Sequence, residues 1–145
     1  MKKLAILVVA LLSASVFAEE KPTPSQALAI LSFPNTDFYK IGSVEEKRAA
    51  RALDNVNGLC SDNLNKVVDK SVAIHEALVK NGYYVTPVEI VEALGTLKRQ
   101  APDGVDCDYI LTHYASTMNQ TPTPAEALAS INSLYKILKS AVDKE

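Results

Sequence analysis

Four short segments share the pattern of a helix start, in which a hydroxyl residue stands three positions before Glu or Gln. They are Thr23 to Gln26, Ser43 to Glu46, Thr86 to Glu89 and Thr123 to Glu126. In such a capping box the hydroxyl accepts from the third helical amide, and the Glu or Gln accepts from the cap amide. Three of the four place Pro at the first helical position, where its missing N–H has no cost. These starts predict a helical chain.

Apolar residues recur at spacings of three and four behind these starts, as they do on one face of a helix. The stripes are Leu64, Val67, Val68, Val72, His75, Leu78 and Val79; Ile90, Leu94 and Leu97; Cys107, Ile110, Leu111, Tyr114, Ala115 and Met118; and Leu128, Ile131, Leu134, Tyr135, Leu138 and Val142. No segment alternates apolar and polar residues over the length of a strand, so we expect no sheet. The predicted fold is all-α, a compact bundle of five to six helices.

Residues 44–81 allow two interpretations, one long helix or two. The apolar stripe keeps its phase through Cys60, which suits a single helix. Asn57 and Gly58 are poor helix formers, and Ser61 is a suitable cap for a new helix. We therefore favour a break or kink at Gly58.

The first eighteen residues differ from the rest of the chain. Two lysines precede a run from Leu4 to Ala18 that is apolar apart from Ser13 and Ser15, and every acidic residue follows that run. The run is shorter than the about 20 residues of a spanning helix, and Val16 to Ala18 resembles a signal-peptidase site. We expect residues 1–18 to be a cleaved signal peptide and residues 19–145 to be one helical domain. The expected location is the bacterial periplasm or the medium, with no stable membrane anchor after cleavage.

The charge of that domain excludes one class of partner. Without Lys2 and Lys3 it carries thirteen basic against seventeen acidic residues, a net charge of −4. Nucleic-acid binders are basic, so we expect no nucleic-acid partner.

Many of the acidic residues stand where helices are expected to begin, because acids in the first turn of a helix interact favourably with the helix dipole. We assign five of the carboxylates to first turns: Glu45, Glu46, Glu89, Glu92 and Glu126.

Cys60 and Cys107 are the only cysteines of the chain. An even number in an exported protein favours a disulfide, here with one possible intramolecular pairing. Closing so long a loop stabilises a fold by about 4 kcal/mol in the chain-entropy model. A redox role is less favoured, because no Cys-x-x-Cys is present and two carboxylates flank Cys107, which disfavours a reactive thiolate.

The chain lacks the residue groups of the common catalytic and metal sites. It has no Gly-x-Ser-x-Gly elbow and no glycine-rich phosphate loop. His75 and His113 fall on separate predicted helices, whereas a zinc site needs three or four ligands. Asp103, Asp106 and Asp108 do not follow the order of an EF-hand, and Asp106 suits a helix cap instead. We expect no catalytic residue, no metal and no cofactor.

Aromatic residues in two predicted loops are the candidate binding residues. Phe38 and Tyr39 lie in the longest loop, residues 33–43, and Tyr83 and Tyr84 follow the expected end of a helix. Tyrosines at loops anchor many protein interfaces. In the alternative interpretation these rings cover the end of the helical core.

Two stretches resemble segments of known families. The stretch from Cys60 to Leu64 is similar to the first cysteine motif of small helical acid-stress chaperones of the bacterial periplasm, with Asn63 at an aromatic position. Val85 to Pro87, followed by Ile90 and Val91, resembles a segment of helical periplasmic immunity proteins, which neutralise peptidoglycan amidases delivered by rival bacteria. Neither resemblance identifies binding residues in this chain.

These observations predict a non-enzymatic protein that binds another protein, as an inhibitor or immunity protein does. The alternative is an acid-stress chaperone, because protonation of the carboxylates would give the chain a strong positive charge and loosen its fold. An enzyme with a site of an unfamiliar kind is the third and least favoured reading.

Overall fold

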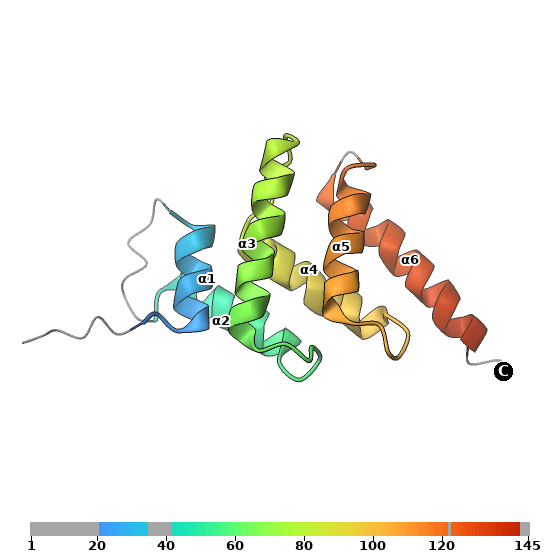
Figure 1. The fold of residues 1–145 in the computed structure, drawn as a ribbon, viewed down its shortest axis with the longest axis horizontal. Helices are drawn as coiled ribbons and strands as arrows, with labels where there is room; N and C mark the ends of the chain where they lie inside the picture. The colour runs from blue at the N-terminus through green and yellow to red at the C-terminus, as the bar shows by residue number, and fades with distance from the viewer. Residues whose placement is uncertain (1–20, 35–41, 122, 143–145) are drawn as a thin grey trace, which may run out of the picture.

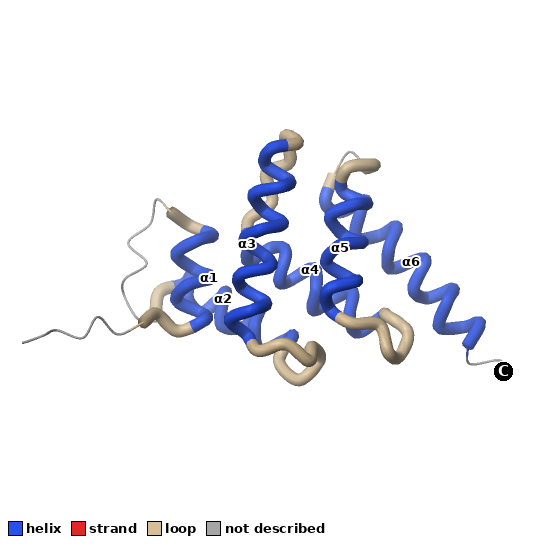
Figure 2. Tube along the Cα trace, viewed as in Figure 1, coloured by secondary structure: helices blue, strands red, loops and turns tan. Residues whose placement is uncertain are grey.

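The computed structural model describes residues 21–34, 42–121 and 123–142. These ranges contain six helices and no strand (Figures 1 and 2). The helices are α1 (Pro24–Ser32), α2 (Val44–Val56), α3 (Leu64–Lys80), α4 (Pro87–Gln100), α5 (Cys107–Met118) and α6 (Pro124–Val142). The predicted all-α bundle is confirmed. The expected signal peptide, residues 1–18, lies outside the described residues, and within those residues no helix has the length and apolarity needed to span a bilayer.

Helix α4 forms the centre of the molecule and contacts each of the other five helices. In Figure 1 it crosses behind α3 and α5. Its buried residues are Pro87, Val88, Ile90, Val91, Ala93, Leu94, Gly95 and Leu97. Burial therefore extends well beyond the single stripe that the sequence predicted. Gly95 permits the close approach of α2, because a Cβ atom there would lie 3.4 Å from both Asn55 Cβ and Val56 Cγ1.

The break within residues 44–81 is confirmed, since a loop separates α2 from α3. Gly58 has a φ of 77°, a left-handed conformation that glycine adopts readily. The expected cap at Ser61 is wrong. Asn63 caps α3 instead, because its Oδ1 accepts from the amide of Lys66 at 3.0 Å. Asn and Ser cap helices about equally well, so residue type alone did not separate the two positions.

The predicted helix starts are confirmed. Thr23 and Thr86 form complete capping boxes. Ser43 and Thr123 each accept from the amide of the Glu three positions on, at 3.1 and 3.2 Å. At Ser43 the box is incomplete, because the carboxylate of Glu46 accepts from the amide of the residue before the cap.

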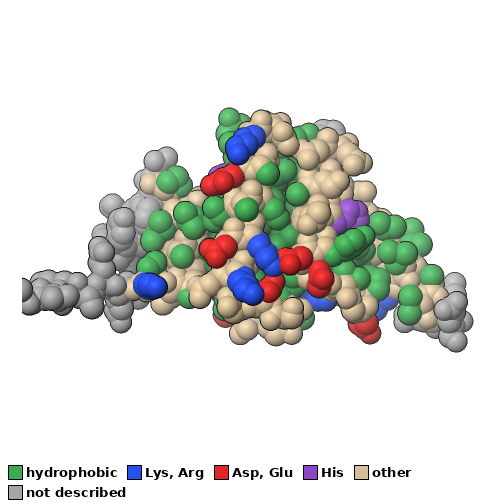
Figure 3. Space-filling view, viewed as in Figure 1, with side chains coloured by type: hydrophobic (Ala, Val, Ile, Leu, Met, Phe, Trp, Pro, Cys, Tyr) green, Lys and Arg blue, Asp and Glu red, His purple; other side chains and the backbone are tan. Residues whose placement is uncertain are grey.

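The C-terminal half of α6 departs from the predicted core stripe. Ile131 and Tyr135 are buried, but Leu134, Leu138 and Val142 are 41%, 43% and 65% exposed. Figure 1 shows this half of α6 running away from the other helices, and Figure 3 shows hydrophobic side chains uncovered over it. The periodicity identified the helix and its apolar face correctly, but periodicity does not say how far a neighbouring helix extends alongside it.

Candidate functional site

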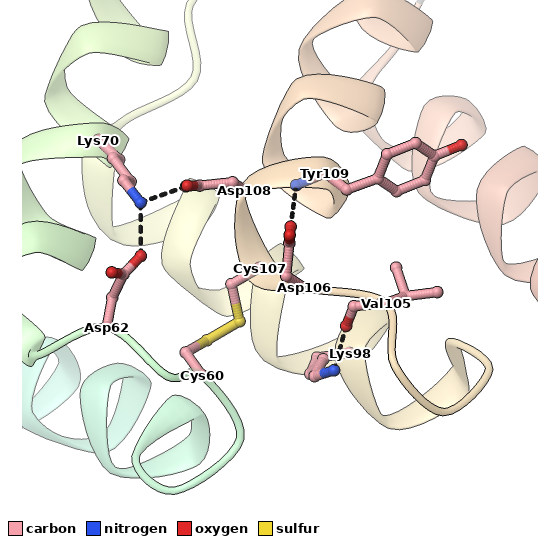
Figure 4. The surroundings of a disulfide bond; sticks show 9 residues. All are labelled: Cys60, Asp62, Lys70, Lys98, Val105, Asp106, Cys107, Asp108 and Tyr109. Atoms are coloured by element: carbon pink, nitrogen blue, oxygen red, sulfur yellow. Dashed lines mark hydrogen bonds and ion pairs between the residues drawn. A yellow bond between two sulfur atoms is a disulfide. The ribbon is translucent and has the colours of Figure 1, made fainter.

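Cys60 and Cys107 form the predicted disulfide (Figure 4). Their Cα atoms are 5.6 Å apart, within the usual range, and 47 positions separate them in the sequence. The bond joins the α2–α3 loop to the first residue of α5. Because Cys107 is buried, the pair acts as a structural cross-link.

Lys70 lies beside this disulfide and contacts the carboxylates of Asp62 and Asp108 (Figure 4). The hydrogen bond from Lys70 is the main cause that lowers the pKa of Asp62. The pKa of Lys70 is raised, first by its hydrogen bond to Asp108 and next by that to Asp62. Asp106 caps α5 as expected, since its carboxylate accepts from the amide of Tyr109 at 2.7 Å. Throughout the described ranges, no group of three or more His, Cys, Asp or Glu is placed to hold a metal ion.

The two histidines have separate packing partners. Nδ1 of His75 lies 2.7 Å from the carbonyl oxygen of Val85, so its side chain has a hydrogen-bond partner within the fold. Nδ1 of His113 lies 3.3 Å from the hydroxyl of Tyr135, and its ring centroid is 5.9 Å from those of Tyr135 and Tyr109. His75 thus connects α3 with the segment just before α4, and His113 lies where α5 packs against α6.

The tyrosines after α3 differ in exposure. The amides of Gly82 and Tyr83 donate to the carbonyls of Val79 and Leu78, at 3.0 and 2.9 Å, which is the Schellman ending of a helix. Tyr83 is partly buried and packs against the core. Tyr84 is 86% exposed. The other two candidates, Phe38 and Tyr39, lie outside the described residues.

Tyr84 stands at the rim of a cleft of about 260 Å³. The cleft lies between α4, α5 and the start of α6. The lining residues that matter for its chemistry are Tyr84, Glu89, Glu92, Tyr114, Ala125 and Leu128. A residue proposed from the sequence therefore lies next to a hollow in the surface, together with residues from three helices.

Two carboxylates from α4 line the cleft. Oε2 of Glu89 accepts from the amide and hydroxyl of Thr86, at 2.8 and 2.7 Å. Oε1 and Oε2 of Glu92 accept from Nε and Nη2 of Arg48, both at 2.7 Å, and this hydrogen bonding is the main cause that raises the pKa of Arg48. The assignment of Glu92 to a first turn is wrong, because Glu89 is the one acid in the first turn of α4 and Glu92 lies one turn later. Two carboxylates with one cation leave this region with a net negative charge.

Tyr114 forms the buried part of the cleft wall. It is 3% exposed, and its hydroxyl makes no hydrogen bond with any described residue. Burial, and secondarily the charge of Glu89, raises the pKa of Tyr114 to about 12, so the hydroxyl stays protonated at neutral pH. The residue is buried, but its hydroxyl oxygen is not fully enclosed, so it can offer both a donor and an acceptor to a group bound in the cleft.

Tyr84 is the one lining residue of the cleft that the sequence had suggested as a binding residue; the other lining residues were not proposed. Glu89 was explained by the capping box and Tyr114 by the core stripe. Both explanations hold, yet both residues also line the cleft. The one available signal was the polar hydroxyl of Tyr114 on an otherwise apolar stripe. Arg48 and Glu92 are 44 positions apart, and no local pattern pairs residues over that distance.

Comparison of the chain with models of protein families, with curated proteins and with solved structures finds no match.

Proposed function

We propose that this is a non-enzymatic protein that binds another protein through the cleft beside Tyr84, in the manner of an inhibitor or immunity protein. The observation that carries the proposal is the 86% exposure of Tyr84 at the rim of a cleft. The residue is held between the Schellman turn at Gly82 and Val85, which is buried. A large ring presented by a rigid backbone loses little entropy on binding, and tyrosine is enriched among the residues that dominate interface energies.

The composition of the cleft favours binding over catalysis. An acyl- or phosphoryl-transfer site needs a nucleophile or base in reach of a reacting group. Neither histidine and neither cysteine lines the cleft. Glu92 is held by two hydrogen bonds to Arg48, and Glu89 by two to Thr86. Carboxylates engaged in this way suit recognition better than proton transfer.

The proposal includes the location. The expected signal peptide directs export from a bacterial cell, and structural disulfides such as Cys60–Cys107 form in oxidising compartments. The partner is therefore sought in the periplasm or the medium.

Affinity capture from periplasmic extract tests this function. The bait is the exported, purified protein, compared with its Tyr84→Ala and Tyr109→Ala variants. Tyr109 is a matched control, because it is 58% exposed and does not line the cleft. We expect wild type and Tyr109→Ala to capture the same protein, and Tyr84→Ala to capture it more than about tenfold less well. Equal capture by Tyr84→Ala, or no capture by wild type at neutral pH, rejects the proposal.

The acid-stress chaperone is the second proposal, supported by a different observation. The C-terminal half of α6 exposes Leu134, Ile137 and Leu138, and such apolar surface suits an unfolded client. A low-pH aggregation assay separates the two functions. Protection of a client that Tyr84→Ala retains and Ile137→Lys loses supports the chaperone, whereas no protection at acid pH rejects it.

A further inference from the structure

We propose that the cleft beside Tyr84 receives an arginine side chain of the partner protein. This inference rests on the proposed function and adds the chemistry of recognition. The size of the cleft is the first argument. At about 260 Å³ it is smaller than the roughly 300–1,000 Å³ of most small-molecule sites, which suits one inserted side chain.

The charge of the cleft selects a cation. Glu89 and Glu92 both line it, and the positive charge of Arg48 is already engaged by Glu92 in a bidentate pair. Glu89 makes no ion pair with any described residue; its hydrogen bonds run to Thr86. An incoming cation would therefore find a carboxylate whose charge is not yet neutralised.

The start of α6 also borders the cleft, and a helix N-terminus by itself favours an anion. Here that terminus is already capped, because Thr123 Oγ1 accepts from the amide of Glu126 at 3.2 Å. Among the described lining residues there is no Lys, Arg or His, while two are Glu. The carboxylates outweigh the helix end, and the cleft is expected to repel anions.

Three groups in the cleft match the guanidinium group of arginine rather than the ammonium of lysine. Tyr84 offers a ring face, Glu89 a carboxylate, and the largely buried Tyr114 a hydroxyl that makes no hydrogen bond with any described residue. A planar guanidinium can stack on a ring and donate several hydrogen bonds in its own plane, whereas an ammonium group is a compact, strongly hydrated charge.

The same chemistry already occurs beside the cleft. The guanidinium carbon of Arg48 lies 5.9 Å from the centroid of the Phe33 ring, while its nitrogens donate to Glu92. Arg48 thus combines a ring contact with a carboxylate pair inside the protein. An arginine of the partner would make the same two kinds of contact, with the ring of Tyr84 and the carboxylate of Glu89.

The test uses N-acetyl-arginine amide as the probe and the amide spectrum of the ¹⁵N-labelled exported protein as the readout. Binding of one side chain is weak, so the titration extends into the millimolar range. We expect shifts confined to the cleft, at Tyr84, Glu89, Tyr114 and Ala125. The blocked amides of lysine and glutamate serve as comparison probes, and at equal concentration each is expected to shift these signals much less.

Two variants and a control assign the contact. Glu89→Gln removes the charge but keeps the helix cap, because Gln26 fills the same position in the capping box of α1, where its Oε1 accepts from the Thr23 amide at 2.9 Å. Tyr114→Phe removes only the hydroxyl. Each is expected to weaken binding about three- to fivefold. Glu76→Gln makes the same charge change at an exposed position outside the cleft and should leave binding unchanged.

Several results would overturn the inference: shifts spread over the surface, equal response to the lysine or glutamate probe, or equal weakening by Glu76→Gln. The captured partner separates this inference from the proposed function. If Tyr84→Ala abolishes capture but Glu89→Gln and the arginine probe have no effect, the protein-binding function stands and the arginine inference fails. If the arginine probe binds the cleft but capture does not depend on Tyr84, the arginine site stands and the proposed function fails.

Discussion

Lys70 contacts carboxylates on both sides of the disulfide, and this contact makes stability depend on pH. Asp62 belongs to the α2–α3 loop and Asp108 to the first turn of α5. The folded-state pKa of Asp62 lies below its ordinary value of 3.8. Its contribution to stability is therefore fully present above the unfolded pKa and is lost as pH falls through the folded pKa.

We expect Asp62→Asn to lower the melting temperature at neutral pH and to match wild type in acid, once pH falls below the folded-state pKa of Asp62. The reason is that the variant lacks the carboxylate that wild type loses only by protonation. Thermal unfolding followed by circular dichroism over a pH series measures the difference. Asp69→Asn on the exposed side of α3 is the control and should show no such trend. A deficit in Asp62→Asn that stays constant into acid would contradict the ionic explanation.

Thr86 begins the central helix, and its hydroxyl is expected to matter more than its methyl group. Its Oγ1 accepts from the amide of Glu89 at 3.4 Å, while Glu89 accepts from the amide of Thr86. We expect Thr86→Ala to reduce the free energy of unfolding by about 1 kcal/mol, measured in urea, and Thr86→Ser to keep most of it. If Ser and Ala cost the same, packing of the methyl group rather than the cap holds the start of α4.

At the scale of the helix, α6 has two halves with different surroundings. Ile131 is 1% exposed, whereas Ile137, in the same helix but outside the predicted apolar stripe, is 65% exposed. We expect Ile131→Ala to cost about 2–5 kcal/mol of unfolding free energy, because it leaves a cavity, and Ile137→Ala to cost less than about 0.5 kcal/mol. Urea titrations of both variants measure this. A comparable loss in Ile137→Ala would mean that a neighbour covers the outer half of α6 in solution.

The sequence predicted those features of the helices that depend on residues only a few positions apart. Thr86 and Glu89 are three positions apart, so their capping box is visible before any fold is known. The wide burial of α4 is different, because an apolar stripe shows which face is buried but not how many helices surround it. For the same reason Leu138 was expected in the core and is exposed. The cleft depends on residues far apart in the sequence, since Tyr84 and Tyr114 come to line the same cleft only when α4 and α5 pack.

At the scale of the whole molecule, two features connect the helices of the N-terminal part of the chain with those of the C-terminal part. The first is α4, which contacts all five other helices. The second is the disulfide, which links the loop before α3 to the start of α5. In Figure 1, α1 and α6 lie at opposite ends of the molecule. The cleft is made by α4, α5 and α6 with Tyr84, so neither cysteine supplies its chemistry.

The disulfide is therefore expected to govern stability and not recognition. With 47 positions between its cysteines, the chain-entropy model assigns it about 4 kcal/mol, against a total of about 5–15 kcal/mol for a typical domain. We expect Cys60→Ala/Cys107→Ala to lose about 4 kcal/mol in urea unfolding and to keep the affinity of its folded fraction for N-acetyl-arginine amide.

Wild type treated with a thiol reductant is the control, because it opens the bond without removing buried sulfur. If reduced wild type is as stable as the oxidised protein while the double variant is not, the loss comes from the packing of Cys107, which is 5% exposed, and the long loop contributes nothing. If the reduced protein is folded but no longer binds the probe, the cross-link also positions α5, and with it Tyr114, in the cleft.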